Sequence, residues 1–393
     1  MLTLHKDARR ILRTFDWGPR QVIQRCWSLL GYQFLDDRAF LPNRVLFNIT
    51  YKCNLKCRTC WWWGEAGIHP RAHELSLEEI KLVVDKLKSF RPSISFTGGE
   101  VLTRQDMPQI LEYVKEQGMK TEIFTNGTLI TPELASRLVA CVDRFMISVE
   151  GSPKMHDAIR GPGTFERTSR GIQLIKEAAR ASRRDVSVRI NCVISSLSLP
   201  FLEEAVETAR SLQCHLTFEH LMFSTDRAAD AHREALRNRL GVEADDTIAG
   251  FLTGFNRLDV DDLTDKLAVV GEHAARLRIP FAVTPFLSQD GQIRSWYTDA
   301  SPMPGLRCTF PWVFLFLRPD GEVTPCEFIR YRFGHALHED LREIWNGPAI
   351  RFFRSGLRKA LLPVCARCCL LMPWPSLTRG ADNPSPASCH SPS

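Results

Sequence analysis

From residue 44 onward, short apolar runs alternate with amphipathic segments of helical period. The apolar runs predict six strands, at residues 45–51, 94–97, 121–125, 145–149, 186–194 and 215–220. Helical segments between them begin with capping signals, such as Ser76 with Glu79 and Thr131 with Pro132. Successive β/α units predict a parallel sheet with functional side chains at the carboxyl ends of its strands. Because six strands do not close an eight-stranded barrel, a partial barrel and an open doubly wound sheet are the alternatives.

Changes in composition divide the rest of the chain. The predicted regions are an N-terminal amphipathic helical pair at 1–43, the α/β core at 44–225, a helical insertion at 226–278, a connector at 279–307, a small cysteine-bearing domain at 308–375 and a tail at 376–393. The small domain contains a predicted hairpin that turns at Pro319-Asp320-Gly321. The tail is rich in Ser and Pro, and we expect it to be disordered.

The composition is that of a globular protein. Of 393 residues, 44% are hydrophobic and 24% charged, which excludes collagen, coiled coil and wholesale disorder. The formal net charge is +6, but residues 1–45 carry eight Lys/Arg against four Asp, so the remaining chain is nearly balanced and no nucleic-acid partner is expected. The basic helical pair either packs on the next domain or contacts a membrane surface or partner through residues 1–31. No apolar run reaches the roughly 18 residues that span a bilayer, and no signal peptide is evident, so we expect a cytoplasmic protein.

The thirteen cysteines are unevenly distributed. In a reducing compartment, clustered thiols indicate metal binding and scattered thiols indicate packing. Cys53, Cys57 and Cys60 lie on one loop directly after the first predicted strand. Three thiols are one short of a closed metal site, so they either leave a metal position free for a small molecule or form half of a zinc site. The remaining cysteines form two groups. A C-terminal set contains Cys308, Cys326, Cys365, Cys368 and Cys369, and five scattered thiols are Cys26, Cys141, Cys192, Cys214 and Cys389.

The second predicted strand ends in Gly98-Gly99-Glu100. Two glycines allow the backbone to approach a polar ligand closely, and the acid accepts hydrogen bonds from an amine, although the same tripeptide also suits a simple turn. The order of strand, three-thiol loop, helix, strand and glycine-glycine-acid resembles the radical S-adenosylmethionine (SAM) superfamily over residues 44 to about 222. This resemblance implies a partial (β/α)6 TIM-like barrel, together with a small C-terminal iron-sulfur domain of hairpin and helices.

The resemblance also implies the cofactors. Cys53, Cys57 and Cys60 would hold a 4Fe-4S cluster whose fourth iron binds the amine and carboxylate of SAM. One electron then cleaves SAM, and the 5′-deoxyadenosyl radical takes a hydrogen atom from the substrate. The electron would come from a reductant such as flavodoxin or ferredoxin.

Further positions are carried over from the superfamily pattern. Gly98, Gly99 and Glu100 resemble the segment that binds the SAM amine, and Asn126 ends the third strand near the cofactor. Ser148 and Glu150 stand where relatives have Ser-x-Asp-Gly facing the ribose or methionyl part, and Arg160 resembles the arginine that pairs with the SAM carboxylate. Asn191 is either a cofactor contact or a satisfied core amide.

Two departures from the superfamily pattern are visible in the sequence. Thr59 replaces the bulky residue that usually packs near adenine, and the indoles at 61–63 are candidates to take over that role. Glu150 replaces an Asp, and its longer side chain leaves its contact undecided.

The C-terminal cysteines resemble the SPASM domain or its short form, twitch. The resemblance rests on two cysteine patterns. The first is Cys308-x17-Cys326 with Gly321 five positions before Cys326, and the second is Cys365-x2-Cys368 followed by Cys369. The resemblance implies one auxiliary 4Fe-4S cluster on Cys308, Cys326, Cys365 and Cys368. Cys369 would replace Cys368, remain a buried spectator or donate a hydrogen atom. The alternative for the set is a structural zinc site.

We therefore expect a radical SAM oxidoreductase that oxidises or epimerises a small, sugar-like molecule. Peptide modification is the alternative, and a zinc-stabilised binding module without enzymatic activity is a distant one. The first 45 residues are shorter than the winged-helix leader-binding domain of many peptide maturases. The helical insertion at 226–278 would act as a lid or as a docking surface.

Overall fold

The computed structural model describes residues 30–35, 37–65, 67–68, 73–243, 246–287, 290–298 and 301–373. Cys26, Cys389, most of the predicted helical pair and the Ser and Pro-rich tail lie outside the described residues. In the described part of the chain, no helix combines the length and apolar character needed to cross a bilayer.

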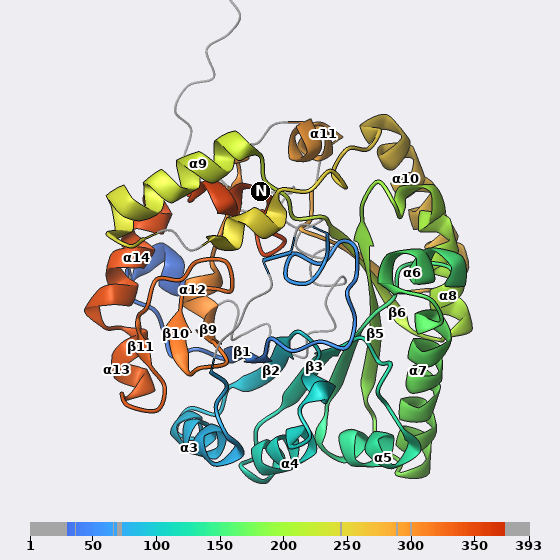
Figure 1. The fold of residues 1–393 in the computed structure, drawn as a ribbon, viewed down its shortest axis with the longest axis horizontal. Coiled ribbons are helices and arrows are strands. Elements are labelled where there is room, and N and C mark those ends of the chain that lie inside the picture. The colour runs from blue at the N-terminus through green and yellow to red at the C-terminus, as the bar shows by residue number, and fades with distance from the viewer. Residues whose placement is uncertain are drawn as a thin grey trace, which may run out of the picture.

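One ten-stranded sheet curves around the centre of the molecule (Figure 1). Its order is β11-β10-β9-β1-β2-β3-β4-β5-β6-β7, and every pair from β9 and β1 through to β6 and β7 is parallel. The strands are β1 (Arg44–Thr50), β2 (Ser93–Gly98), β3 (Thr121–Thr125), β4 (Arg144–Ser148), β5 (Ser187–Ile194), β6 (His215–His220), β7 (Phe281–Thr284), β9 (Phe314–Leu317), β10 (Glu322–Thr324) and β11 (Gly334–His335). A separate pair joins β8 (Leu306–Arg307) to β12 (Met372–Pro373).

Helices cover the outer face of the curved sheet, as Figure 1 shows for α3, α4, α5, α7 and α8. The capping signals hold, because Ser76 and Glu79 form a complete capping box and Thr131 Oγ1 accepts from Leu134 N at 3.2 Å. The helices are α3 (Leu77–Leu87), α4 (Met107–Glu116), α5 (Pro132–Cys141), α6 (Pro153–Arg160), α7 (Thr164–Ala181), α8 (Leu202–Ser211), α9 (Asp226–Ala235), α10 (Val260–Arg276), α11 (Asp290–Thr298), α12 (Phe310–Val313), α13 (Leu341–Trp345) and α14 (Pro348–Lys359). Shorter turns are η1 (Val101–Thr103), η2 (Leu199–Phe201), η3 (Leu236–Leu240), η4 (Asp246–Phe251) and η5 (Pro363–Arg367).

The expected partial barrel is confirmed, and it extends further than the six predicted strands. β7 continues the parallel sheet beyond β6, so part of the segment predicted as a connector belongs to the barrel. On the other side, β9 pairs in parallel with β1, and the expected hairpin joins β9 to β10. The first strands of the cysteine-bearing domain therefore continue the barrel sheet at its β1 edge.

The barrel interior is filled at the amino ends of the strands. There the Glu122 carboxylate accepts from Ser95 at 2.6 Å, from Arg44 at 3.1 Å and from Arg144 at 3.5 Å. Burial by itself raises the pKa of Glu122, but the two guanidinium groups outweigh it and lower the pKa overall. A network of paired charges thus occupies the barrel interior at the amino ends of the strands.

The interior is open toward the carboxyl ends of the strands. Inward-facing residues there, such as Met146, Ser148 and Asn191, are half-buried and alternate with buried residues that face the helices. The Phe124 ring on β3 is 37% exposed, although it lies on a strand inside the barrel. Any bound molecule inside the barrel would therefore enter from this end.

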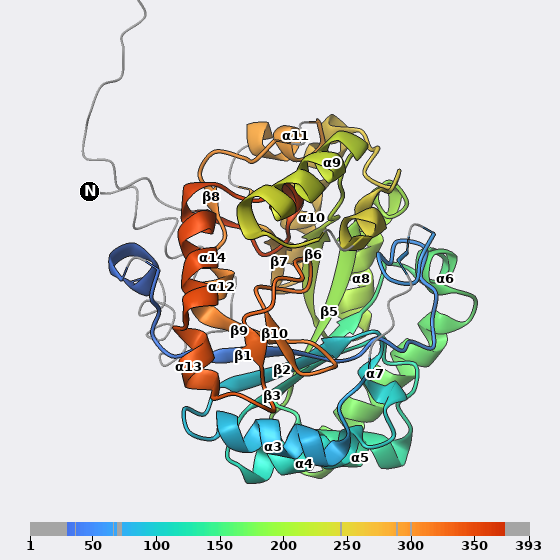
Figure 2. The same cartoon turned by 60° about the vertical axis from the view of Figure 1, so that its left-hand side comes forward.

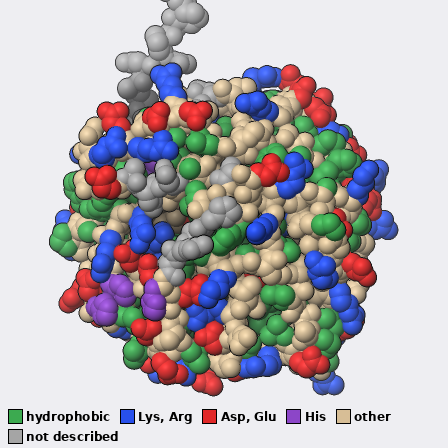
Figure 3. Space-filling view, in the orientation of Figure 1, with side chains coloured by type: hydrophobic (Ala, Val, Ile, Leu, Met, Phe, Trp, Pro, Cys, Tyr) green, Lys and Arg blue, Asp and Glu red, His purple; other side chains and the backbone are tan. Residues whose placement is uncertain are grey.

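The C-terminal domain is held to the barrel and to residues 30–41 by buried polar contacts. Arg354 on α14 is fully buried, and it donates to the carbonyls of Pro311 at 2.9 Å and Asp37 at 3.2 Å. Its guanidinium lies 4.4 Å from the centre of the Trp345 ring. Lys86 on α3 donates to the carbonyl of Ala336 at 2.7 Å. Figure 2 shows α14 beside the blue segment of residues 30–41, and Figure 3 shows charges of both signs interspersed on the surface.

We expect the fold to lose stability below pH 6.5 because of buried neutral histidines. Burial lowers the pKa of His220 to about 3, and its Nδ1 pairs with the Tyr297 hydroxyl at 2.9 Å. A depressed folded-state pKa means that the unfolded chain binds more protons as the pH falls, so this stabilisation is complete above the unfolded pKa and is lost below it. Between pH 7 and pH 5 the loss from one such group is about 2 kcal/mol. Urea unfolding should show this extra pH dependence in the wild type and not in His220→Gln, and equal slopes would contradict it.

Candidate cofactor and cluster site

The three-thiol loop begins where β1 ends, at the open end of the barrel. Cys53 Sγ accepts from Leu55 N and Cys60 Sγ accepts from Trp63 N, each at 3.4 Å. Backbone N–H groups that point at sulfur stabilise thiolates, which is the ligand form of cysteine. Burial raises the pKa of Cys53 to about 12, so this thiol needs a cation to ionise at neutral pH. The local chemistry therefore suits a metal centre.

The Gly98-Gly99 pair lies directly against the start of the thiol loop. Gly98 has φ +135°, and a Cβ at this position would lie 2.1 Å from Thr50 O. A Cβ on Gly99 would lie 2.2 Å from Lys52 O, because Gly99 N donates to Thr50 O at 2.9 Å. The two glycines are required by this close approach of two backbone segments. Their expected contact with the SAM amine stays a prediction.

Glu100 is completely buried, and its carboxylate is occupied by protein donors. Oε1 accepts from Thr125 Oγ1 at 2.7 Å and from Leu102 N at 3.1 Å, while Oε2 accepts from Asn126 N at 2.6 Å. This carboxylate therefore joins the ends of β2 and β3. The predicted contact of Glu100 with the SAM amine stays a prediction.

Asn54, which the sequence interpretation did not single out, holds the thiol loop to the loop after β3. Its Oδ1 accepts from Asn126 Nδ2 at 2.8 Å, and its Nδ2 donates to Thr128 Oγ1 at 2.9 Å. Asn54 lies between Cys53 and Cys57, so these two hydrogen bonds order the backbone between two thiols. The sequence shows an amide side chain within the cysteine motif, but it does not show that this amide pairs with Asn126.

Glu150 and Arg160 form a buried ion pair next to the second thiol. Arg160 donates from Nη2 at 2.6 Å and from Nε at 3.1 Å to Glu150 Oε1. The remaining nitrogen, Nη1, lies 3.8 Å from Cys57 Sγ. Glu150 Oε2 accepts from Val193 N at 2.9 Å, and Glu150 N donates to His156 Nδ1 at 3.2 Å. Both predicted residues thus lie beside the thiol loop, where each already has a protein partner.

The predicted residues on β4 and β5 lie on the inner wall of the barrel. Ser148 and Asn191 are cross-strand neighbours, and both are half-buried. Asn191 Nδ2 donates to Glu219 Oε2 at 2.8 Å, so the amide is paired with a carboxylate from β6. Glu219 was not among the residues predicted from the sequence, although its place at the carboxyl end of a strand was a usable signal. The cofactor roles of Ser148 and Asn191 stay predictions.

The three indoles that follow Cys60 pack within the protein. Trp62 is buried edge-on against Tyr51 with ring centroids 4.8 Å apart, and Trp63 Nε1 donates to Tyr51 O at 2.8 Å. Trp61 stacks on Phe251 of η4 at 5.1 Å and meets Phe328 edge-on at 5.5 Å. The contacts of Trp61 thus connect the thiol loop, the helical insertion and the C-terminal domain.

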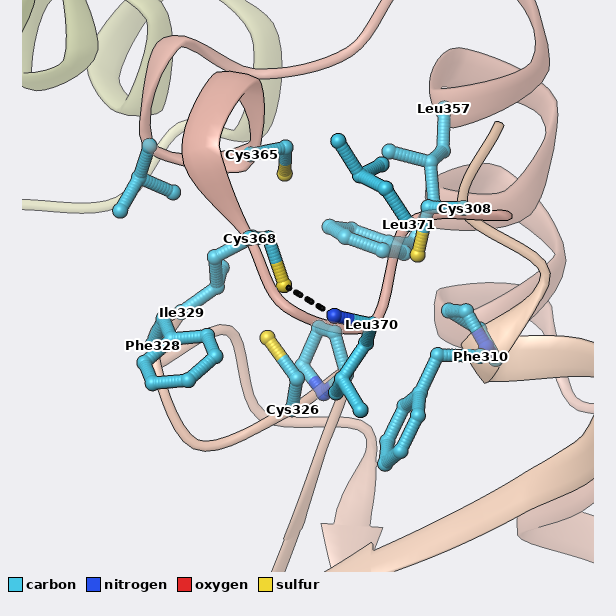
Figure 4. A pocket seen from close by; sticks show the side chains of 14 residues that line it. Cys308, Phe310, Cys326, Phe328, Ile329, Leu357, Cys365, Cys368, Leu370 and Leu371 are labelled. Atoms are coloured by element: carbon cyan, nitrogen blue, oxygen red, sulfur yellow. Dashed lines mark hydrogen bonds between the residues drawn. The ribbon is translucent and has the colours of Figure 1, made fainter. Parts of the chain in front are cut away.

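Four C-terminal thiols line one apolar cavity (Figure 4). Apolar neighbours such as Phe310 and Leu371 complete its wall. The thiols that line it are Cys308, Cys326, Cys365 and Cys368.

The chemistry of this cavity fits a bound metal cluster. Burial raises the pKa of Cys308 to about 12 and raises the pKa values of Cys326 and Cys365 well above the ordinary thiol value. Thiols with these pKa values become ligands when a cation displaces their protons. In the described residues, no three His, Cys, Asp or Glu side chains converge on a position for one metal ion. Four cysteine thiolates are the ligand set of a 4Fe-4S cluster and also of a structural zinc site, so the donors present fit the expected cluster.

Cys369 does not line this cavity. Its thiol is close to the thiol of Cys368 and the carboxylate of Glu219, and the contact with Cys368 together with burial raises its pKa well above the ordinary value. Cys369 therefore lies between the thiol cavity and the inner wall of the barrel. This placement favours Cys368 over Cys369 as the fourth thiol of the cavity.

Comparison with protein families gives two matches. Residues 47–194 match the radical SAM superfamily, and residues 308–369 match SPASM, an iron-sulfur cluster-binding domain. These ranges contain both groups of thiols described above.

Similar proteins include enzymes with different products. The AdoMet-dependent heme synthase of Methanosarcina barkeri is 27% identical over 79% of this chain and 83% of its own length. The mycofactocin maturase MftC of Mycobacterium tuberculosis is 32% identical over 49% of each chain. Among solved structures, Streptococcus suis SuiB bound to S-adenosylmethionine has a TM-score of 0.60 at 15% identity, covering 93% of this chain and 83% of SuiB, which shows a shared fold. The chain therefore belongs to the radical SAM superfamily of enzymes, with SAM and a 4Fe-4S cluster as cofactors, and carries a C-terminal SPASM domain for auxiliary iron-sulfur binding.

Proposed function

We propose that this enzyme oxidises a small molecule inside the barrel, between two 4Fe-4S clusters. Cys53, Cys57 and Cys60 would hold the cluster that binds SAM, and Cys308, Cys326, Cys365 and Cys368 would hold one auxiliary cluster. The observation that carries the second assignment is the convergence of those four thiols on one apolar cavity. Four protein ligands close a cluster, which suits electron transfer better than substrate binding.

The proposed reaction balances in electrons and protons. When bound, the first cluster supplies the electron that splits SAM into methionine and a 5′-deoxyadenosyl radical. The substrate would lose one hydrogen atom to that radical, then one electron to an auxiliary cluster held by the four thiols and one proton to a base. Glu219 is a candidate for this base, because it lies on the inner wall beside Asn191 and close to Cys369. A reductant of the flavodoxin or ferredoxin class would supply the first electron.

The helical insertion supports a small substrate. Phe251 stacks on Trp61 and also meets Phe328 edge-on at 5.4 Å. Gly250 approaches the Trp61 backbone so closely that a Cβ would lie 2.2 Å from Trp61 O. Ser224 N donates to Phe251 O at 2.7 Å and fixes the insertion to the segment after β6. The contacts among Trp61, Phe251 and Phe328 thus form a wall on one side of the open end of the barrel. This wall favours a compact substrate over a folded protein.

The names of the relatives support the same class. The heme synthase relatives span about four fifths of this chain and act in tetrapyrrole synthesis, so a tetrapyrrole is the first class of compound to test, with sugar-like molecules next. The peptide alternative is supported by the mycofactocin maturases, which match about half of this chain.

Substrate-stimulated SAM cleavage separates the two functions. The reconstituted enzyme would be incubated anaerobically with SAM and dithionite, and with either the small-molecule or the peptide-and-protein fraction of a cell extract. We expect the small-molecule fraction to raise 5′-deoxyadenosine formation. Fe-coproporphyrin III, the compound in the name of a similar synthase, is the first pure compound to assay. Stimulation by the peptide-and-protein fraction alone would establish the peptide alternative and contradict the proposal.

A further inference from the structure

We propose that Arg318 binds a carboxylate group of the substrate, in a polar site between the barrel and the C-terminal domain. Three neighbours, Asn48, Glu219 and Glu327, accept hydrogen bonds from hydroxyl or amine groups of the same molecule. The inference deepens the proposed function and rests on it, since it narrows the small molecule to a polar carboxylic acid.

Arg318 is a buried cation without a counter-ion in the described part of the chain. It directly follows β9, the strand that pairs in parallel with β1. The residue is 8% exposed, and its Nε is buried without a hydrogen-bond partner among the described residues. Its guanidinium lies 5.8 Å from the centre of the Tyr51 ring, a contact that does not use the N–H donors. Because a buried, unpaired charge is strongly unfavourable, this position suits an anion that binds from outside the chain.

Asn48 supplies a second unpartnered polar group at the same place. It is 0% exposed, and on β1 it lies on the face opposite to the buried Phe47 and Ile49. Its Nδ2 donates to Glu327 Oε1 at 3.0 Å, which fixes the orientation of the amide. Its Oδ1 is buried and has no hydrogen-bond partner among the described residues. Buried polar groups are nearly always hydrogen-bonded, so this acceptor suits a donor group of a bound molecule.

The polar site lies where a substrate would have access to both groups of thiols. Glu327, the partner of Asn48, directly follows Cys326 of the thiol cavity. The charges of Arg318 and Glu219 both act on the Glu327 carboxylate, so the three groups lie near one another. Since Glu219 is on the inner wall of the barrel, these contacts connect the C-terminal domain with the barrel interior.

The surrounding charges favour a carboxylate over a phosphate. A carboxylate carries one negative charge and pairs with one guanidinium through two parallel hydrogen bonds. A phosphate monoester carries nearly two negative charges at neutral pH, so Glu219 and Glu327 would repel it more strongly. The same two glutamates and the Asn48 carbonyl oxygen are acceptors, which complement hydroxyl or amine groups of the substrate. The site therefore fits a small acid that also carries such donors.

The first test uses the reconstituted wild-type chain and chemically treated samples of the small-molecule fraction of a cell extract. We expect the untreated fraction to stimulate 5′-deoxyadenosine formation. Esterification of its carboxylic acids with methanol should remove the stimulation, and hydrolysis of the esters should restore it. Phosphatase treatment should leave it intact. Full stimulation by the esterified fraction, or loss of stimulation after phosphatase treatment, overturns the proposal.

The second test measures how much of the untreated fraction gives half-maximal stimulation. Arg318→Gln should raise this amount at least about tenfold, because it removes the charge that pairs with the carboxylate. Arg318→Lys keeps the charge without the paired donors and should fall between Arg318→Gln and the wild type. Arg330→Gln is the matched control, since it removes an exposed arginine that pairs with Glu322 beside the same hairpin, and it should match the wild type. Iron content and circular dichroism check that each variant is assembled.

SAM affinity separates a substrate contact from a cofactor contact. It should stay within about twofold of the wild type in Arg318→Gln, and a loss of about tenfold or more would assign this arginine to SAM and overturn the proposal. A wild-type half-maximal amount in Arg318→Gln would overturn it as well. If the peptide-and-protein fraction alone stimulates the wild-type chain, the proposed function itself fails, so the two failures are distinguishable.

Discussion

Replacement of Cys53, Cys57 and Cys60 together by Ala is expected to abolish reductive SAM cleavage. 5′-Deoxyadenosine formation should fall by on the order of a thousandfold or more, because the electron reaches SAM through the cluster that these thiols hold. Iron content should fall by about four atoms per chain, while the auxiliary site remains loaded. Mass spectrometry of the nucleoside and an iron assay on the same anaerobic sample measure both effects.

The matched control is Cys141→Ala. Cys141 is buried at the end of α5, away from both groups of thiols, and its loss should change neither iron content nor SAM cleavage. If the triple variant still produces 5′-deoxyadenosine at the wild-type rate, the assignment of these three thiols is wrong.

Replacement of Cys308 and Cys326 by Ala is expected to separate SAM cleavage from product formation. Two of the four thiols around the apolar cavity are then lost, and the auxiliary cluster should no longer assemble. Iron should again fall by about four atoms per chain. SAM cleavage should continue in part, because the first thiol loop follows β1 and keeps its own contacts, but the substrate radical would lose its electron acceptor. Product yield per 5′-deoxyadenosine should therefore fall at least about tenfold.

Cys214→Ala is the control for this second result, since Cys214 is a buried thiol outside both sites. Circular dichroism on each variant distinguishes loss of the cluster from loss of the fold. Full coupling of SAM cleavage to product in the Cys308 and Cys326 variant would show that the auxiliary site takes no electron from the substrate.

Local patterns in the sequence were sufficient to predict the six central strands and the main helix caps. Each of these depends on neighbouring residues, as in the pairing of Ser76 with Glu79. The four-residue strand β7 was not predicted, because Phe281–Thr284 is too short for a period-2 pattern to stand out. The pairing of β9 with β1 joins residues about 270 positions apart, and such contacts leave no local pattern.

The site was predictable in its components and not in its pairings. The thiols and the Gly-Gly-Glu segment were found from motif spacing, because cluster binding requires cysteines on one loop and close backbone approach. The sequence did not show that Glu100 accepts from Thr125 and Asn126, or that Glu150 holds Arg160. These partners come from different strands, and only the folded sheet brings them together. The reductant, the cytoplasmic location and membrane contact of the N-terminal residues stay predictions.

The central claim is that two groups of thiols hold two four-iron clusters, and iron content tests it most directly. Wild-type chain reconstituted anaerobically with iron and sulfide should bind roughly eight iron atoms and a matching amount of sulfide. It should also release 5′-deoxyadenosine from SAM on reduction. A chain that instead retains one or two zinc ions, takes up no iron and leaves SAM intact would contradict the account.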